Sequence, residues 1–255
     1  MLFITLLLGW VGSMALPTPL LARQQATTYD LGDDLTVRQI APDVWMHTST
    51  SRVDGQPVPA NGLLVATEAT AFLVDTAWND DQARRLLDWA EATLHKPVTA
   101  ALVTHSHEDR TGGLQTVLDR GIRVHALRLT ARRAAARQAP LPDTLFDAVA
   151  TIMMGTRSFE AFYPGAGHAP DNIVVWIPHA HILVGGCFIK DAGATTLGYV
   201  GDAALDQWPS ALARAAERYP EAALVIPGHG AVGGLDLLHH TESLLQEAAK
   251  KQPGG

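Results

Sequence analysis

The chain has 255 residues, of which 47% are hydrophobic and 18% are charged, and both values are ordinary for a globular protein. This length is enough for one large domain with a buried core, or for two small domains. The formal net charge of −7 argues against the basic surface that nucleic-acid binding requires, so no nucleic-acid partner is expected.

The first 22 residues contain no charged side chain and open with an apolar run that Gly9 and Gly12 interrupt. The run is too short for a membrane span, which needs about 20 apolar residues. It is typical of the apolar core of a secretory signal peptide, although no Lys or Arg precedes it. We therefore predict a signal peptide over residues 1–22, cleaved after Ala15 or Ala22, with export of residues 23–255 and no stable membrane anchor.

Strands and helices alternate along the predicted mature chain. Strands are expected over residues 36–40, 44–48, 63–66, 71–75 and 100–104, with helices over 81–94, from Gly112 onward and over 130–138. Further strands are expected over 159–163, 172–177, 181–184, 197–200 and 223–226, with helices over 208–218 and 235–249. No low-complexity linker divides the chain, so we predict a single α/β domain in which two β-rich halves stack, with helices outside.

The arginines of residues 128–137 lie in an Ala-rich helical stretch. We interpret them as a solvated helix face rather than as a phosphate-binding site.

The segment His105-Ser106-His107-Glu108-Asp109 directly follows the apolar strand of residues 98–104. Two imidazoles and a carboxylate at alternate positions suit a turn at the end of a strand, where the three side chains converge on one point. This is a ligand set for a divalent cation, with zinc as the first candidate.

Three more potential ligands lie downstream, each in a Gly-containing turn next to a strand: His168, Cys187 and His229. Cys187 is the only cysteine, so it cannot form an intramolecular disulfide, and it is either a small buried hydrophobe or a thiolate with a chemical role. Such turns can also serve only to reverse the chain, with the His simply exposed. The recurrence of one context three times favours metal binding.

Four motifs follow one another along the chain: His-x-His-x-Asp, Gly-His with Asp-Asn close behind, Gly-Gly-Cys and Pro-Gly-His-Gly. In this order they resemble the motifs of the metallo-β-lactamases of subclass B1. The resemblance covers essentially the whole mature chain, and residues 219–230 and 233–238 are most similar to the Verona integron-encoded type. Glyoxalase-II-like members of the superfamily usually carry a His where this chain has Arg110, and a bridging carboxylate where it has Cys187. The resemblance implies a four-layer αβ/βα sandwich, with two β-sheets packed face to face and helices on the outer faces.

The resemblance also implies two zinc ions per chain. His105, His107 and His168 would hold the first ion, and Asp109, Cys187 and His229 would hold the second. Three neutral imidazoles leave one tetrahedral position open for a water, whose pKa the metal lowers to about 7. Asp109 would orient the resulting hydroxide as it attacks the β-lactam carbonyl, so the reaction requires no protein nucleophile. The chain contains no Ser-x-x-Lys, the motif of the serine β-lactamases.

Three further residues correspond to positions around the family's substrate pocket. Lys190 would anchor the substrate carboxylate, or is a surface lysine. Tyr199 stands where many relatives have an Asn proposed to contact the lactam carbonyl, and it is equally well explained as a plain strand residue. Trp78 would line the pocket edge or pack half-buried, and residues 51–59 would form a hairpin flap over the site. Asp75 is expected to support the metal ligands by hydrogen bonds.

By resemblance, the chain would be a monomeric periplasmic enzyme that hydrolyses penicillins, cephalosporins and carbapenems and so confers antibiotic resistance. Two alternatives remain open. The first is a superfamily hydrolase that acts on lactones or thioesters, and the second is a non-catalytic zinc-binding protein.

Overall fold

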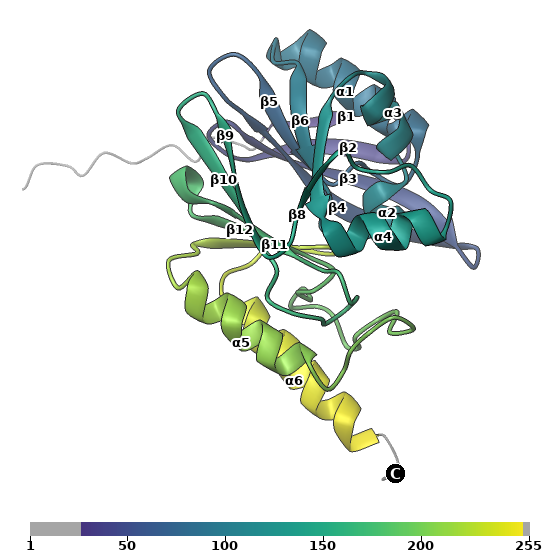
Figure 1. The fold of residues 1–255 in the computed structure, drawn as a ribbon, viewed down its shortest axis with the longest axis vertical. Helices are drawn as coiled ribbons and strands as arrows, with labels where there is room; N and C mark the ends of the chain where they lie inside the picture. Colours follow the sequence, from purple (N-terminus) through teal and green to yellow (C-terminus); the bar gives the residue numbers. More distant parts are fainter. Residues whose placement is uncertain (1–26, 252–255) are drawn as a thin grey trace, which may run out of the picture.

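The computed structural model describes residues 27–251 (Figure 1). The predicted signal peptide lies outside the described residues. Within residues 27–251, no helix combines the length and the apolar character that crossing a membrane requires.

The first sheet has eight strands in the order β1 to β8. Its strands are β1 (Thr28–Asp30), β2 (Leu35–Ala41), β3 (Val44–Val53), β4 (Gln56–Ala66), β5 (Ala71–Val74), β6 (Val98–Leu102), β7 (Arg123–Leu127) and β8 (Thr144–Phe146). β1 to β5 run antiparallel to their neighbours, and β5 to β8 run parallel. The β3–β4 hairpin extends to an Asp54-Gly55 turn in which both residues have positive φ, so the predicted flap is the tip of this hairpin.

The second sheet has five strands in the order β13-β12-β11-β10-β9. Its strands are β9 (Val149–Met154), β10 (Arg157–Phe162), β11 (Val174–Ile177), β12 (Ile182–Gly186) and β13 (Leu224–Pro227). Only the β12–β13 pair is parallel. The carboxyl ends of β12 and β13 therefore lie at the same edge of the sheet.

Helices cover the outer face of each sheet, as Figure 1 shows. The helices are α1 (Asp80–Leu94), α2 (Glu108–Thr111), α3 (Leu114–Asp119), α4 (Arg128–Ala136), the 3-10 helix η1 (Pro178–Ala180), α5 (Trp208–Arg218) and α6 (Asp236–Lys251). α1 begins where the Asn79 side chain accepts a hydrogen bond from the Gln82 backbone N–H, and it ends at His95 in the left-handed conformation.

Three apolar clusters separate four layers. One lies between the sheets and includes Phe72 and Phe159, whose rings stack 4.2 Å apart. A second lies between the first sheet and α1, and a third lies between the second sheet and the α5–α6 pair, around Trp208. The predicted αβ/βα sandwich is confirmed.

Most predicted elements are present, but two kinds of error occur. Residues 197–200 form no strand; Gly198 has a φ of +67°, and Tyr199 and Val200 are exposed within a long loop. Neither sheet includes this segment, so it has no neighbouring strand to pair with and no buried face. The predicted strands do not include β1, β7, β8 and β9, because polar residues and short lengths weaken their alternating pattern.

Candidate metal centre

Six potential ligands meet at one edge of the sandwich, five in the loops that follow β6, β10, β12 and β13 and one, Asp109, in the short helix α2. Their ligand atoms form three overlapping groups, and within each group every atom lies within 4.8 Å of the others. The groups are His105–His107–Asp109, His105–His168–Cys187 and Asp109–Cys187–His229. The structure therefore brings together all six residues that the sequence singled out.

His105, His107 and His168, which we call the three-histidine group, face one another edge to face. The centroids of their rings are 4.6 to 5.1 Å apart. Nε2 of His168 lies 3.2 Å from Nδ1 of His107, and Nε2 of His105 is buried without a hydrogen-bond partner among the described residues. Burial and the neighbouring imidazoles hold the pKa values of His105 and His168 well below the ordinary value, so both rings are neutral and able to bind a cation.

Asp202 determines which nitrogen of His107 is free. Nε2 of His107 lies 3.0 Å from Oδ2 of Asp202, and the carboxylate can only accept a hydrogen bond. The hydrogen bond from His107 and the nearby arginine charges keep the pKa of Asp202 below its ordinary value. Nε2 of His107 therefore carries the proton, and Nδ1 presents its lone pair to the centre of the group.

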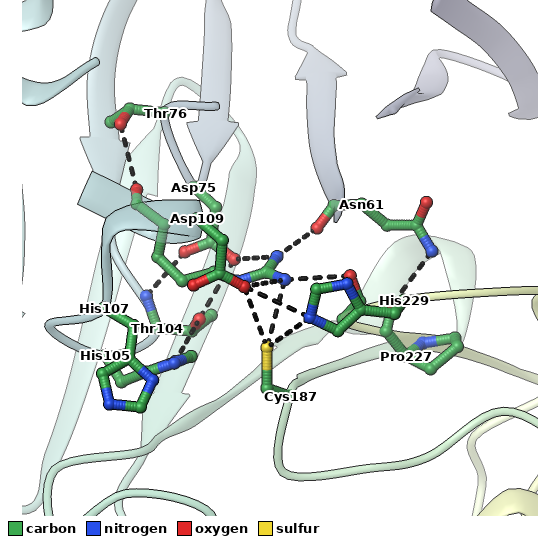
Figure 2. Close-up of polar contacts among 12 residues, drawn as sticks. Asn61, Asp75, Thr76, Thr104, His105, His107, Asp109, Cys187, Pro227 and His229 are labelled. Carbon is green, nitrogen blue, oxygen red and sulfur yellow. Dashed lines mark hydrogen bonds and ion pairs between the residues drawn. The ribbon is translucent and has the colours of Figure 1, made fainter. Parts of the chain in front are cut away.

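Asp109, Cys187 and His229, which we call the thiolate group, make mutual contacts (Figure 2). Sγ of Cys187 lies 3.2 Å from Oδ2 of Asp109 and 3.2 Å from Nε2 of His229. Nδ1 of His229 donates to the backbone oxygen of Pro59 at 2.6 Å, which leaves Nε2 for a ligand role. A Cβ on Gly228 would lie 2.7 Å from this sulfur, so glycine is required for the turn to pass so close.

Arg110, the residue after the motif aspartate, lies fully buried beneath the thiolate group. Its guanidinium donates to Oδ2 of Asp109 at 2.8 Å, to Sγ of Cys187 at 3.1 Å and to the backbone oxygen of Gly228 at 2.9 Å. It also donates to the backbone oxygen of Asn61 and lies 3.3 Å from Oδ2 of Asp75. Burial alone would raise the pKa of Asp109, but Arg110, together with His229 and His105, holds it well below the ordinary value.

Asp75, which directly follows β5, supports this arrangement. Its carboxylate accepts hydrogen bonds from the backbone N–H of Thr104 at 2.7 Å and from the Thr104 hydroxyl at 3.0 Å. Burial raises the pKa of Asp75 to about 6, against the opposing charge of Arg110. These bonds fix the start of the loop that carries His105 and His107.

The six side chains fit a metal centre. Imidazole nitrogens, a thiolate and a carboxylate are the ligands that zinc prefers. The unpartnered Nε2 of the buried His105 would be costly unless it met a cation, because a buried polar atom without a partner loses its solvation.

A cavity of about 850 Å³ opens onto both groups. Lys190 borders it beside Cys187, largely buried, and its Nζ lies 5.6 Å from the centre of the Trp208 ring. Burial lowers the pKa of Lys190. Lys190 is therefore not the plain surface lysine of the alternative interpretation.

Apolar and aromatic side chains form the rim of the cavity. Val53 and Val58 from the hairpin tip line it together with the half-buried Trp78. Tyr199 is 64% exposed, and its ring lies edge-on to that of His107 with centroids 5.6 Å apart. The interpretation of Tyr199 as a strand residue is wrong, because it lies in a loop that faces the cavity.

Two arginines near the site carry no motif that assigns them to it. Arg133 and Arg137 were interpreted as part of a solvated helix face, but both reach Asp202, and Arg137 lines the cavity. The interpretation is incomplete for this pair: Arg137 is exposed, as a solvated face requires, but both arginines also contact Asp202, whereas Arg128 pairs with Asp147 at the surface. The spacing of four residues, which places two side chains on one side of a helix, was the available signal.

The fold and the site together define a class of protein. Residues 55–229 match the family model described as the metallo-beta-lactamase superfamily. The chain is 40% identical to the metallo-beta-lactamase type 2 of Bacillus cereus over 214 residues, which cover 83% of each chain. It is 34% identical to the metallo-beta-lactamase type 2 of Bacteroides fragilis over 236 residues, which cover 92% of this chain and 94% of the relative.

Solved structures agree with this relationship. A metallo-beta-lactamase from Pontibacter korlensis is 42% identical with a TM-score of 0.81, and the alignment covers 83% of this chain and 99% of the other. TMB-1 is 38% identical with a TM-score of 0.81, over 85% of this chain and 99% of the other. The chain belongs to the metallo-β-lactamase family and has relatives of the B1 type; the expected closeness to the Verona type stays a prediction.

Proposed function

We propose that this enzyme is a zinc-dependent β-lactamase that holds two zinc ions and opens the lactam ring of penicillins, cephalosporins and carbapenems. The observation that carries the proposal is the convergence of six potential ligands at a cavity that five of them and Lys190 line. The relatives named metallo-beta-lactamase support it.

In this proposal, His105, His107 and His168 hold one ion, and Asp109, Cys187 and His229 hold the other. When bound, zinc supplies an activated water and positive charge for the atoms that become negative during C–N cleavage. The pKa of Asp109 is low, so its carboxylate stays charged and accepts a hydrogen bond from the attacking water, which orients that water toward the carbonyl.

Lys190 positions the substrate. A β-lactam antibiotic carries a carboxylate beside its ring, and the ammonium group beside Cys187 would bind it at the thiolate side of the cavity. The acyl side chain would then extend along the rim toward Trp78 and Tyr199. Tyr199 presents an aromatic ring where many relatives present an amide, so we expect this rim to select substrates by stacking more than by hydrogen bonding.

Export would place this activity in the periplasm, where it would destroy the drug before the drug reached its targets and would so confer resistance. We propose that the chain acts there as a monomer, after cleavage of a signal peptide within residues 1–22. Amino-terminal sequencing of the exported protein tests the cleavage after Ala15 or Ala22.

The purified mature chain tests the proposal with a panel of substrates. We expect hydrolysis of a carbapenem and a cephalosporin, loss of that activity with a chelator, and recovery with zinc at a ratio of two ions per chain. Faster turnover of a lactone or thioester than of any lactam would favour the other superfamily hydrolases. Zinc binding without turnover of any of these substrates would indicate a non-catalytic zinc-binding protein.

A further inference from the structure

Two arginines at the end of α4 connect three loops around the three-histidine group. Arg133 lies in α4, and Arg137 is the residue that follows its last turn. Since they are four residues apart, their side chains leave the helix on the same side. We call Arg133 and Arg137 the arginine pair.

The first loop that the arginine pair contacts carries His105 and His107. Nη1 of Arg137 donates to the backbone oxygen of Ser106 at 2.8 Å, and Nε of Arg133 donates to the Ser106 hydroxyl at 3.2 Å. Ser106, the residue between the two histidines, is therefore held through both its backbone oxygen and its side-chain hydroxyl.

The second loop carries His168 and includes Asp171, which is fully buried. Nε of Arg133 lies 3.4 Å from Oδ1 of Asp171, while Oδ2 of Asp171 accepts a hydrogen bond from the backbone N–H of Ser106 at 2.9 Å. Arg133 thus bridges the loops that bring His107 and His168 together.

The third loop carries Asp202, in the stretch between β12 and α5 that has no regular secondary structure. Nη2 of Arg133 donates to Oδ2 of Asp202, and Nη2 of Arg137 lies 3.3 Å from the same oxygen. This is also the oxygen that lies 3.0 Å from Nε2 of His107. Because 28% of the Asp202 side chain is exposed, water would compete for the carboxylate if the arginine pair did not hold it.

We propose that Arg133 and Arg137 are positioning residues for the first metal site, and that they act through Asp202 to hold His107 with Nδ1 aimed at the metal. The inference rests on the proposed role of His107 as a metal ligand. It concerns residues that touch neither the metal nor the substrate's reacting atoms. Groups that hold a metal-binding histidine in place are typically worth about 10- to 100-fold in metal affinity.

The test is a titration of the metal-free chain with Co²⁺, comparing the Arg133→Gln/Arg137→Gln double variant with wild type. The thiolate-to-cobalt absorption reports on the thiolate group, and the remaining ligand-field bands report on the three-histidine group. We expect the double variant to bind Co²⁺ about 10- to 100-fold more weakly at the three-histidine group and equally well at the thiolate group. Arg132→Gln is the matched control, because Arg132 lies exposed on the same helix, and it should bind both ions as wild type does.

Two further readouts separate positioning from general support of the fold. In the cobalt-loaded protein, the shifted proton resonance of the His107 ring N–H should exchange with water faster in the double variant. In an Asp202→Ala background, adding the two arginine substitutions should weaken Co²⁺ binding by a smaller factor than in the wild-type background, since the pair acts in part through Asp202.

The inference is wrong if the double variant binds both ions as tightly as Arg132→Gln. It is also wrong if both groups weaken equally alongside a fall in Tm, or if the arginine and Asp202 effects add. These results are distinct from a failure of the proposed function, which would appear as a wild-type chain that binds cobalt at both groups yet hydrolyses no lactam.

Discussion

The three-histidine group and the thiolate group lie side by side, but the protein stabilises them in different ways. The thiolate group rests on Arg110, a fully buried cation that contacts both Asp109 and Cys187. The three-histidine group consists of imidazoles, and the carboxylate that contacts it, Asp202, is partly exposed.

This difference matches the chemistry of the ligands. Asp109 is a buried carboxylate, so a cation must lie beside it before and after a metal binds. Three neutral imidazoles need only correct orientation, which a hydrogen bond from one ring nitrogen provides. One group is therefore sensitive to the loss of charge, and the other to the loss of orientation.

Removing a ligand from the three-histidine group should have the largest effect on activity. His105→Ala removes the ring whose Nε2 is buried without a partner, and it should lower kcat/KM for a cephalosporin at least about 1,000-fold, equivalent to about 4 kcal/mol. His95→Ala, outside both groups, serves as the control. Activity within tenfold of wild type would contradict the assignment of His105 as a ligand.

Removing the buried cation should affect stability most. Arg110→Met leaves Asp109 and Asp75 buried without their partner, and we expect it to lower the free energy of unfolding by about 3–5 kcal/mol. Urea denaturation measures this change. Arg120→Met breaks only the surface pair with Asp88 and should cost less than about 1 kcal/mol; equal losses in the two variants would show that burial of Arg110 has no special weight.

Replacing a ligand of the thiolate group should release the zinc ion of that group and leave the ion at the three-histidine group in place. Cys187→Ser replaces a soft ligand with a hydroxyl, so zinc content should fall from two ions per chain to one, and activity should fall about 100-fold. Metal analysis after dialysis provides the measurement. Retention of two ions per chain would refute the role of Cys187.

Lys190 should change substrate binding rather than chemistry. Lys190→Gln removes the ammonium group beside the thiolate group, and we expect KM for a carboxylate-bearing lactam to rise about 10-fold, which corresponds to about 1.4 kcal/mol, while zinc content stays the same. The surface variant Lys250→Gln is the control. An unchanged KM would contradict the proposed binding of the substrate carboxylate by Lys190.

Sequence reasoning recovered the parts of the site that local patterns encode. Each of the six proposed ligands stands in a short motif beside a strand, and their order along the chain carried the resemblance to a family. The apolar periodicity of α1, α5 and α6 likewise predicted the helices that cover the sheets.

The parts that were missed depend on contacts between distant residues. Asp202 meets His107 across 95 positions, and Arg133 meets Asp202 across 69, so no local spacing reveals either contact. The sequence marks Arg110 only as a difference from other hydrolases, since all of its partners except the neighbouring Asp109 come from distant strands and turns. Residues 197–200 have the composition of a strand, and only their position outside both sheets excludes it.

The ligands divide evenly between the two sheets of the sandwich. Loops of the first sheet bring His105, His107 and Asp109, while loops of the second bring His168, Cys187 and His229. Neither half alone contains a complete set of three ligands for either proposed ion. Capture of the second ion would therefore have to come late in the maturation of the chain, after β13 has been made and docked, since His229 follows that strand. Either bound ion would then act as a cross-link that resists separation of the two halves.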